Sequence, residues 1–187
     1  YKESGKLTAN EYMVKTIVTS ELTKLVAEKN GVKMFDCYTG FKWIAAIMLE
    51  LEGKRKYIGG GEYSFGFLAE DFVRDKDSVS AAGLFGEMLA WAKADGKSLY
   101  ELLQEVYIQY GFSKEKGVSV TKPGRTGAEE IENMMRNFRN NPLKEIAGSK
   151  VILIKDFATL KAQDFNSNEI FTLEMPTTSN VLQYFTE

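Results

Sequence analysis

Apolar positions in the first 110 residues switch repeatedly between the period of a strand and the period of a helix. A β-branched run at 13–19 predicts a strand, and Ser20 after it is placed to cap a helix. Asn30 and Gly31 are typical of the end of that helix. The same reasoning predicts, in order, a strand at 32–37, a helix over 41–52, a strand from 57 into the glycines at 59–61, and helices at about 78–93 and 98–110. This alternation predicts an α/β layer with a largely parallel sheet.

The pattern changes after about residue 115. A strand-like segment at 118–121 precedes a helix that we expect to begin at a capping box of Thr126 and Glu129 and to run to Arg139. The segment Asn-Asn-Pro at 140–142 is typical of the end of such a helix. Three strand candidates follow, at 151–155, 170–175 and 181–185. We therefore predict an α/β fold, a three-layer domain with a mainly parallel mixed sheet, followed by part of an α+β domain.

Charge and composition narrow the possible partners. The sequence has 24 basic and 26 acidic residues, a formal net charge of -2, so no positive field predicts binding to nucleic acid or to an anionic membrane. No run approaches the roughly 20 apolar residues that span a bilayer. Cys37, the single cysteine, cannot form a disulfide within the chain. We expect a cytoplasmic protein whose phosphate contacts are local.

Histidine is absent from the sequence, and this limits the chemistry. Ser-His-Asp triads, Cys-His pairs and histidine metal sites are all excluded, so that any acid or base is a carboxylate, a lysine or a tyrosine. The sequence also opens at Tyr1 without an initiator methionine or a leader, and we expect it to be cut from inside a longer protein.

The candidate chemistry lies at the end of the third predicted strand. The glycines at 59–61 let the backbone turn tightly and approach a ligand, and ligands bind at the carboxyl ends of strands in open α/β sheets. Glu62 and Ser64 follow and would point into that cleft. Further along, Arg74 and Lys76 offer cations that can bind a phosphate. On spacing alone, an ordinary turn and a solvated ion-pair surface are the alternatives.

The segment GEYSFG at 61–66 resembles the GEESFG sugar-binding loop of the α-D-phosphohexomutases, the phosphoglucomutase and phosphomannomutase family. Further segments are similar to family motifs: TGFKWI at 39–44 to the TGxK turn, DKDSVSAA at 75–82 to the DKDGVSAA helix start, and LEMP at 173–176 and QYFT at 183–186 to the last strands. The resemblance implies that residues 1–113 are domain three, the sugar-binding domain, and that 114–187 are the incomplete N-terminal part of domain four.

The family interconverts sugar 1-phosphates and 6-phosphates through a phosphoserine and a bisphosphate intermediate, and the resemblance implies this function for the parent enzyme. By the same resemblance, Glu62 and Ser64 hold sugar hydroxyls. Lys76, together with Arg74, meets the phosphate that is not reacting, and Thr39 and Gly40 line the same cleft. The partners implied are a small-molecule sugar phosphate and the missing domains of the same chain.

Several departures from the family pattern bear on activity. The nucleophile loop TASHNP and the metal loop DGDxDR are absent, and the sequence stops before an RPSGTEP phosphate loop. We therefore expect the Mg²⁺ and the sugar bisphosphate to belong to the full-length parent, with neither bound here, and this piece to be inactive alone. Tyr63 stands where the family usually has a second glutamate. A phosphopentomutase-like relative and a non-catalytic sugar-phosphate-binding module are the alternatives.

Overall fold

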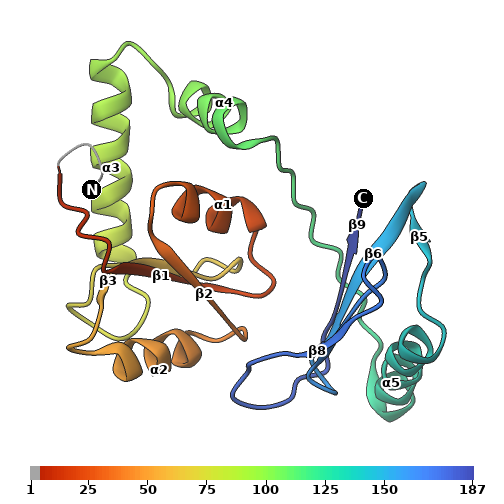
Figure 1. Cartoon of the computed structure of the whole chain (residues 1–187). Helices are drawn as coiled ribbons and strands as arrows, with labels where there is room; N and C mark the ends of the chain where they lie inside the picture. Colours follow the sequence, from red (N-terminus) through yellow and green to blue (C-terminus); the bar gives the residue numbers. More distant parts are fainter. Residues whose placement is uncertain (1–4) are drawn as a thin grey trace. The chain divides into compact units, whose positions relative to one another are not determined.

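The structure is a computed structural model that describes residues 5–187 (Figure 1). The chain divides into two compact units, of which the first ends at Lys116 and the second runs from Gly117 to Glu187. This division lies close to the domain boundary expected at residues 113 and 114. Each unit has its own sheet, and the two are described separately.

The first unit is built on a four-stranded sheet with the order β2-β1-β3-β4. Its strands are β1 (Glu11–Thr16), β2 (Lys33–Cys37), β3 (Lys56–Gly61) and β4 (Phe67–Ala69). The central strand β1 pairs in parallel with β2 and with β3, whereas β4 pairs antiparallel with β3. The sheet is therefore mixed and mainly parallel, as predicted. The sequence pattern predicts a loop for the three residues of β4, and this prediction is wrong because they pair with β3.

Helices α1 (Glu21–Lys29) and α2 (Phe41–Leu51) connect the parallel strands. The side chain of Ser20 accepts a hydrogen bond from the Leu22 N–H and caps α1, which confirms the predicted cap. Gly40 is the N-cap of α2, and its φ of 116° lies in a region that favours glycine. Both helices start directly after the carboxyl end of a strand, so their N-termini lie at the edge of the sheet where ligands bind in this class of fold.

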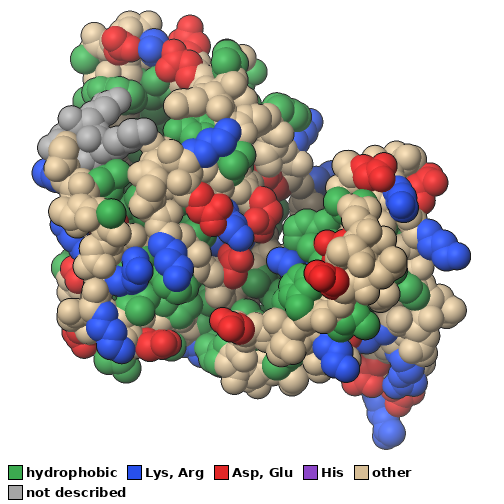
Figure 2. All heavy atoms as spheres, viewed as in Figure 1, with side chains coloured by type: hydrophobic (Ala, Val, Ile, Leu, Met, Phe, Trp, Pro, Cys, Tyr) green, Lys and Arg blue, Asp and Glu red, His purple; other side chains and the backbone are tan. Residues whose placement is uncertain are grey.

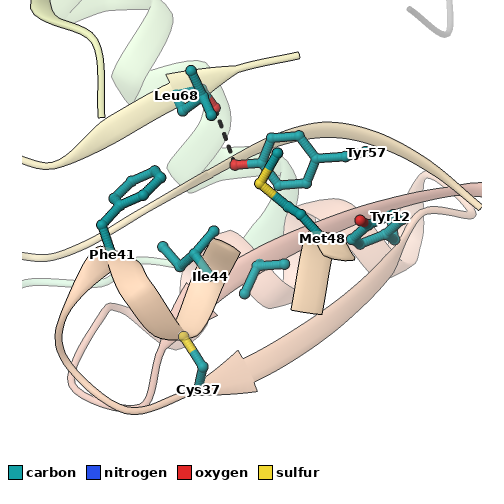
Figure 3. Close-up of a cluster of buried hydrophobic side chains, with 8 residues drawn as sticks. Tyr12, Cys37, Phe41, Ile44, Met48, Tyr57 and Leu68 are labelled. Carbon is teal, nitrogen blue, oxygen red and sulfur yellow. Dashed lines mark hydrogen bonds between the residues drawn. The ribbon is translucent and has the colours of Figure 1, made fainter. Parts of the chain in front are cut away.

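Alternation along β1 places the two helices on opposite faces of the sheet. Tyr12 and Val14 face a core that α2 completes with Phe41, Ile44 and Met48 (Figure 3). The intervening residue Met13 instead packs against the cluster of Ala27, Val32 and Met34, where Ala27 belongs to α1. The sheet is thus sandwiched between helices, and the predicted three-layer arrangement is confirmed. Fully burying each large apolar side chain contributes about 1.5–3 kcal/mol.

Two more helices complete the first unit, α3 (Ser78–Ala94) and α4 (Leu99–Tyr110). Asp77 caps α3 by accepting hydrogen bonds from the N–H groups of Val79 and Ser80. Ser98 and Glu101 form the predicted capping box at the start of α4. In Figure 1, α3 meets the sheet only near its N-terminal end and extends away from it.

The second unit combines one helix with an antiparallel sheet. Helix α5 (Gly124–Asn140) precedes five strands, β5 (Glu145–Ile146), β6 (Ser149–Asp156), β7 (Lys161–Asp164), β8 (Ile170–Thr172) and β9 (Leu182–Thr186). The strand order is β5-β6-β7-β8, and β9 pairs with β6. The Tyr184 hydroxyl donates to the Phe138 carbonyl, and Arg139 pairs with Asp156, so two contacts fasten the end of α5 to the sheet. The α+β class is as predicted.

Two predictions for this second unit are wrong. Residues 118–121 lie in no strand or helix, because Val118 and Val120 stay exposed and gain no burial by pairing. Helix α5 begins before Thr126, with Pro123 at its N-cap and no capping side chain. Thr126 is the third residue of α5 and so lies inside the first turn, where it cannot act as the N-cap.

In the part of the chain that the structure describes, no helix combines the length and apolar character needed to cross a membrane. Acidic and basic side chains intermingle on the face shown in Figure 2. That mixture agrees with the net charge of -2.

Candidate functional site

The glycine run at the end of β3 is required by packing. A Cβ on Gly60 would collide with the backbone carbonyl of Val14 in β1 and with the Tyr57 hydroxyl. A Cβ on Gly61 would lie 2.7 Å from the carbonyl oxygen of Gly66. These two glycines therefore let β3 approach its neighbours closely, and the loop that follows starts from a rigid strand end.

The loop at 62–66 is closed by its own backbone. The Glu62 N–H donates to the Gly66 carbonyl at 2.7 Å. Phe65 adopts a left-handed conformation, with φ of 61°, and its side chain is fully exposed. The Glu62 side chain folds over Gly66, where an added Cβ would lie 2.7 Å from Oε2. The carboxylate position therefore depends on the absence of a side chain at residue 66.

Glu62 is also held by the turn before α2. The Gly40 N–H donates to Glu62 Oε1 at 2.5 Å, which joins two segments that lie 22 residues apart. Gly40 is the N-cap of α2, and a carboxylate at a helix N-terminus is stabilised by the helix dipole and by unpaired N–H groups. Oε1 of the Glu62 carboxylate therefore already accepts a hydrogen bond from the protein backbone. The other oxygen, Oε2, lies beside Gly66.

The two predicted cations lie at different ends of α2. The Lys76 ammonium lies 5.8 Å from the ring centroid of Phe41, the first residue of α2, and 3.1 Å from Asp75. Arg74 pairs with Glu52, the C-cap of α2. Since α2 has 11 residues, its ends are about 16 Å apart at 1.5 Å per residue.

The structure therefore brings most of the predicted site residues together and separates Arg74 from them. Thr39, Gly40, Glu62 and Lys76 gather around the beginning of α2, and Ser64 is exposed on the same loop as Glu62. Arg74 belongs to the far end of the helix in this conformation. Its assignment to the phosphate stays a prediction, and so do the roles of the others.

Sequence reasoning missed a buried lysine beside this loop. A cavity of about 400 Å³ lies at the carboxyl ends of β1 and β3, and its lining includes Lys15, Thr19 and Glu62. Lys15 is almost fully buried, and its ammonium lies 2.8 Å from Glu21 and 2.9 Å from Asp36. The sequence did carry a signal for this burial, since Lys15 is a charged residue inside a run of β-branched residues that predicts a strand.

Lys15 keeps its charge despite its burial. Burial lowers the pKa of the Lys15 ammonium, but hydrogen bonds to Glu21 and Asp36 outweigh this effect, and the pKa lies above its usual value. The ammonium therefore presents a fixed positive charge in the wall of the cavity. Its three neighbours, the two carboxylates and the Thr19 carbonyl, also tie down the loop between β1 and α1.

Cys37 is not a nucleophile in this structure. Burial raises the pKa of its thiol to about 12, and the charges of Asp36 and Glu62 act in the same direction. The group is therefore a protonated thiol at neutral pH. Among residues 5–187, no three acidic or cysteine side chains gather closely enough to hold a metal ion.

The fold and the loop define an α/β/α domain with a cleft at the carboxyl edge of its sheet, where Lys15, Thr19 and Glu62 stand among mostly apolar neighbours. A model of the phosphoglucomutase/phosphomannomutase alpha/beta/alpha domain III matches residues 1–110. The chain therefore belongs to the phosphoglucomutase/phosphomannomutase family.

Individual relatives agree with this assignment. The chain is 36% identical to a phosphoglucomutase of Staphylococcus epidermidis over 95% of its length and 33% of the relative. It is 38% identical to a phosphoglucomutase of Staphylococcus aureus over 90% of its length and 29% of that protein. The chain thus spans about a third of the length of these curated relatives.

A solved structure agrees with the fold. The match to the open form of pp63/parafusin, a phosphoglucomutase of Paramecium, covers 92% of this chain and 28% of the parafusin chain. Its TM-score is 0.55, and the two sequences are 21% identical. Its likeness supports the α/β fold alone.

Proposed function

We propose that this chain supplies sugar recognition to an enzyme that interconverts sugar 1-phosphate and sugar 6-phosphate. The observation that carries the proposal is the Glu62 carboxylate at the edge of the sheet, which accepts a hydrogen bond from the Gly40 N–H through Oε1 and lies over Gly66, a residue without a side chain. Membership of the phosphoglucomutase/phosphomannomutase family supports the reaction class. The substrate class is therefore a sugar phosphate.

The roles of the site residues follow from hydrogen-bonding chemistry. A mutase substrate binds in two opposite orientations, and a carboxylate accepts from hydroxyl groups whichever way round they lie. Glu62 Oε2 and the Ser64 hydroxyl would hold the ring hydroxyls. Lys76, at the beginning of α2, would bind the phosphate that is not reacting, with Arg74 joining it after leaving Glu52. Thr39 and Gly40 would form the wall between them.

The phosphoryl transfer itself needs groups beyond these residues. Mg²⁺ would polarise the phosphoryl group and lower its charge in the transition state, and we assign no ligand of it to this chain. A phosphoserine nucleophile and the bisphosphate would likewise belong to the longer enzyme. We expect the 187 residues alone to be inactive. A cytoplasmic location stays a prediction.

The proposal is tested in the longer enzyme by replacing Glu62. Glu62→Ala should lower kcat/KM by at least about tenfold, since one charged hydrogen bond is worth roughly 1.5–3 kcal/mol. Glu50→Ala, on the exposed side of α2, is the matched control and should leave the kinetics unchanged. Equal kinetics for both variants would refute the role of Glu62.

Two further measurements separate the alternatives. Comparison of glucose, mannose and ribose phosphates decides between hexose and pentose substrates. The complete gene must encode a TASHNP-like loop and a DGDxDR-like loop if the parent is a mutase, and a gene without them would leave a non-catalytic sugar-phosphate-binding module.

A further inference from the structure

Phe65, in the loop that begins at Glu62, combines two features that cost stability. Its φ of 61° lies in the left-handed region, where a residue with a Cβ is strained and where glycine or asparagine is preferred. Its aromatic ring is fully exposed, so burial among residues 5–187 does not offset that strain. Strained backbone of this kind clusters at sites that bind ligands. Phe65 is therefore a candidate for a contact made in function.

Other left-handed residues of the chain have local explanations. Ala147 and Gly148 form the two-residue turn between β5 and β6, and such a turn needs positive φ at both positions. Asn168 is of a residue type that tolerates this conformation. Phe65 has neither explanation, since its loop would close equally well with a glycine or an asparagine at this position.

The Phe65 ring borders the cavity into which the Glu62 carboxylate is set. With a volume of about 400 Å³, that cavity is within the size range of small-molecule sites. Its lining combines a few polar groups with apolar side chains, among which are Met13, Met34 and Phe65. The hydrogen bond from the Glu62 N–H to the Gly66 carbonyl closes the loop around Phe65. The exposed ring and the carboxylate therefore belong to one small, closed segment.

We infer that Phe65 is a substrate-binding residue whose ring packs against the C–H face of the bound sugar, while Glu62 and Ser64 bind its hydroxyl groups. A sugar ring carries C–H groups on its faces, and the flat face of an aromatic side chain can cover them. Apolar contact has no direction, so it suits a substrate that binds in two opposite orientations. The inference rests on the proposed function and adds an apolar contact to it.

Two substitutions in the longer enzyme separate the ring from the backbone conformation. Phe65→Asn removes the ring and keeps a residue that tolerates positive φ, whereas Phe65→Tyr keeps the ring. With glucose 1-phosphate or mannose 1-phosphate as substrate, Phe65→Asn should raise KM at least about fivefold and change kcat little, because it removes binding that the ground state and the transition state share. Phe65→Tyr should keep the original KM. Inorganic phosphate, which has no sugar ring, should inhibit all three proteins with the same Ki.

Ala147→Asn is the matched control. Ala147 is exposed and left-handed like Phe65, but it lies in the hairpin of the second unit, outside the loop. This substitution should leave KM and kcat unchanged. Neither asparagine variant should lower the Tm of the longer enzyme without ligand, because strain is relieved and no buried contact is lost.

Three results would overturn the inference. An unchanged KM in Phe65→Asn would show that the ring does not touch the sugar. A Ki for inorganic phosphate that rises together with KM would assign the effect to distortion of the whole site. A lower Tm without ligand would show that the ring packs against another part of the longer polypeptide.

Glu62→Ala distinguishes failure of this inference from failure of the proposed function. A lower kcat/KM in Glu62→Ala together with unaltered kinetics in Phe65→Asn would refute the Phe65 contact and leave the proposed function standing. A longer enzyme that turns over neither sugar phosphate would refute both.

Discussion

Gly66 shows how one missing side chain can place a functional group. An added Cβ at Gly66 would meet Glu62 Oε2, the end of a flexible side chain, whereas a Cβ at Gly60 would meet the fixed backbone of Val14. The first collision can be relieved by moving the carboxylate, and the second requires the strands to separate. The two glycines therefore differ in effect, since Gly60 lets two strands pair closely and Gly66 leaves room for the Glu62 carboxylate.

We predict that Gly66→Ala displaces the Glu62 carboxylate with little loss of stability, below about 1 kcal/mol. The Gly40 amide proton should move upfield in the NMR spectrum, because it loses its hydrogen bond to Glu62, and sugar-phosphate binding by the longer enzyme should weaken. The amide shift is read in this chain alone, without any ligand.

The matched control is Gly83→Ala, since Gly83 lies in α3 with open space around it. It should leave the Gly40 resonance unchanged. An unchanged Gly40 shift in Gly66→Ala, or strong unfolding of that variant, would contradict the assigned role of Gly66.

At the scale of elements, Lys15 joins three segments of the first unit. Lys15 belongs to β1, and its ammonium forms ion pairs with Glu21, the first residue of α1, and with Asp36 in β2. Replacement of the lysine would leave the two carboxylates close together without a cation. Removing one partner of a fully buried ion pair costs 3–5 kcal/mol, and the cost is smaller here because Glu21 is half exposed.

We predict that Lys15→Met lowers the free energy of unfolding by about 2–3 kcal/mol, measured by urea denaturation at neutral pH. Lys54→Met, at an exposed lysine, should change it by less than about 0.5 kcal/mol. Similar values for the two variants would show that the buried ion pairs contribute no net stability.

Elements with local signals could be predicted from the sequence, and elements that depend on distant pairing could not. Ser20 caps α1 and Ser98 with Glu101 begins α4, because both signals lie within four residues of the helix start. The strand β4 has three residues and exists through its pairing with β3. The segment 118–121 shows the converse, since an alternating pattern without a partner forms no strand.

In the candidate site, too, residue types could be predicted from the sequence, whereas contacts between distant segments could not. Its residue types could be named from the GEYSFG motif, but the hydrogen bond from Gly40 to Glu62 depends on β2 and β3 lying on either side of β1. The separation of Arg74 from Lys76 likewise follows from the length of α2. Lys15 was missed because a lysine within a strand run is ordinarily read as an exposed position.

At the scale of the whole molecule, buried groups with raised pKa values predict how stability depends on pH, and Tyr57 and Lys15 act here in the same direction as Cys37. Burial raises the pKa of Tyr57 well above its usual range, and its hydroxyl donates to the Leu68 carbonyl at 3.2 Å. The pKa of Lys15 is raised as well. In the unfolded chain these groups titrate near their ordinary values of about 10 for tyrosine and 10.4 for lysine.

Above pH ~10 the unfolded state therefore loses protons that the folded state retains, so the free energy of unfolding falls as the pH rises. Tyr57→Phe should lower stability at pH 7 by about 1 kcal/mol, through loss of the hydrogen bond, and should make the decline above pH ~10 shallower, because one of the buried groups with a raised pKa no longer titrates. Urea denaturation at pH 7 and at high pH tests both effects, with Tyr100→Phe at an exposed position as the control. An equally steep decline in Tyr57→Phe and in the unaltered chain would show that this buried tyrosine does not couple folding to pH, and would leave the other buried groups with raised pKa values, Lys15 and Cys37 among them, as the source of the decline.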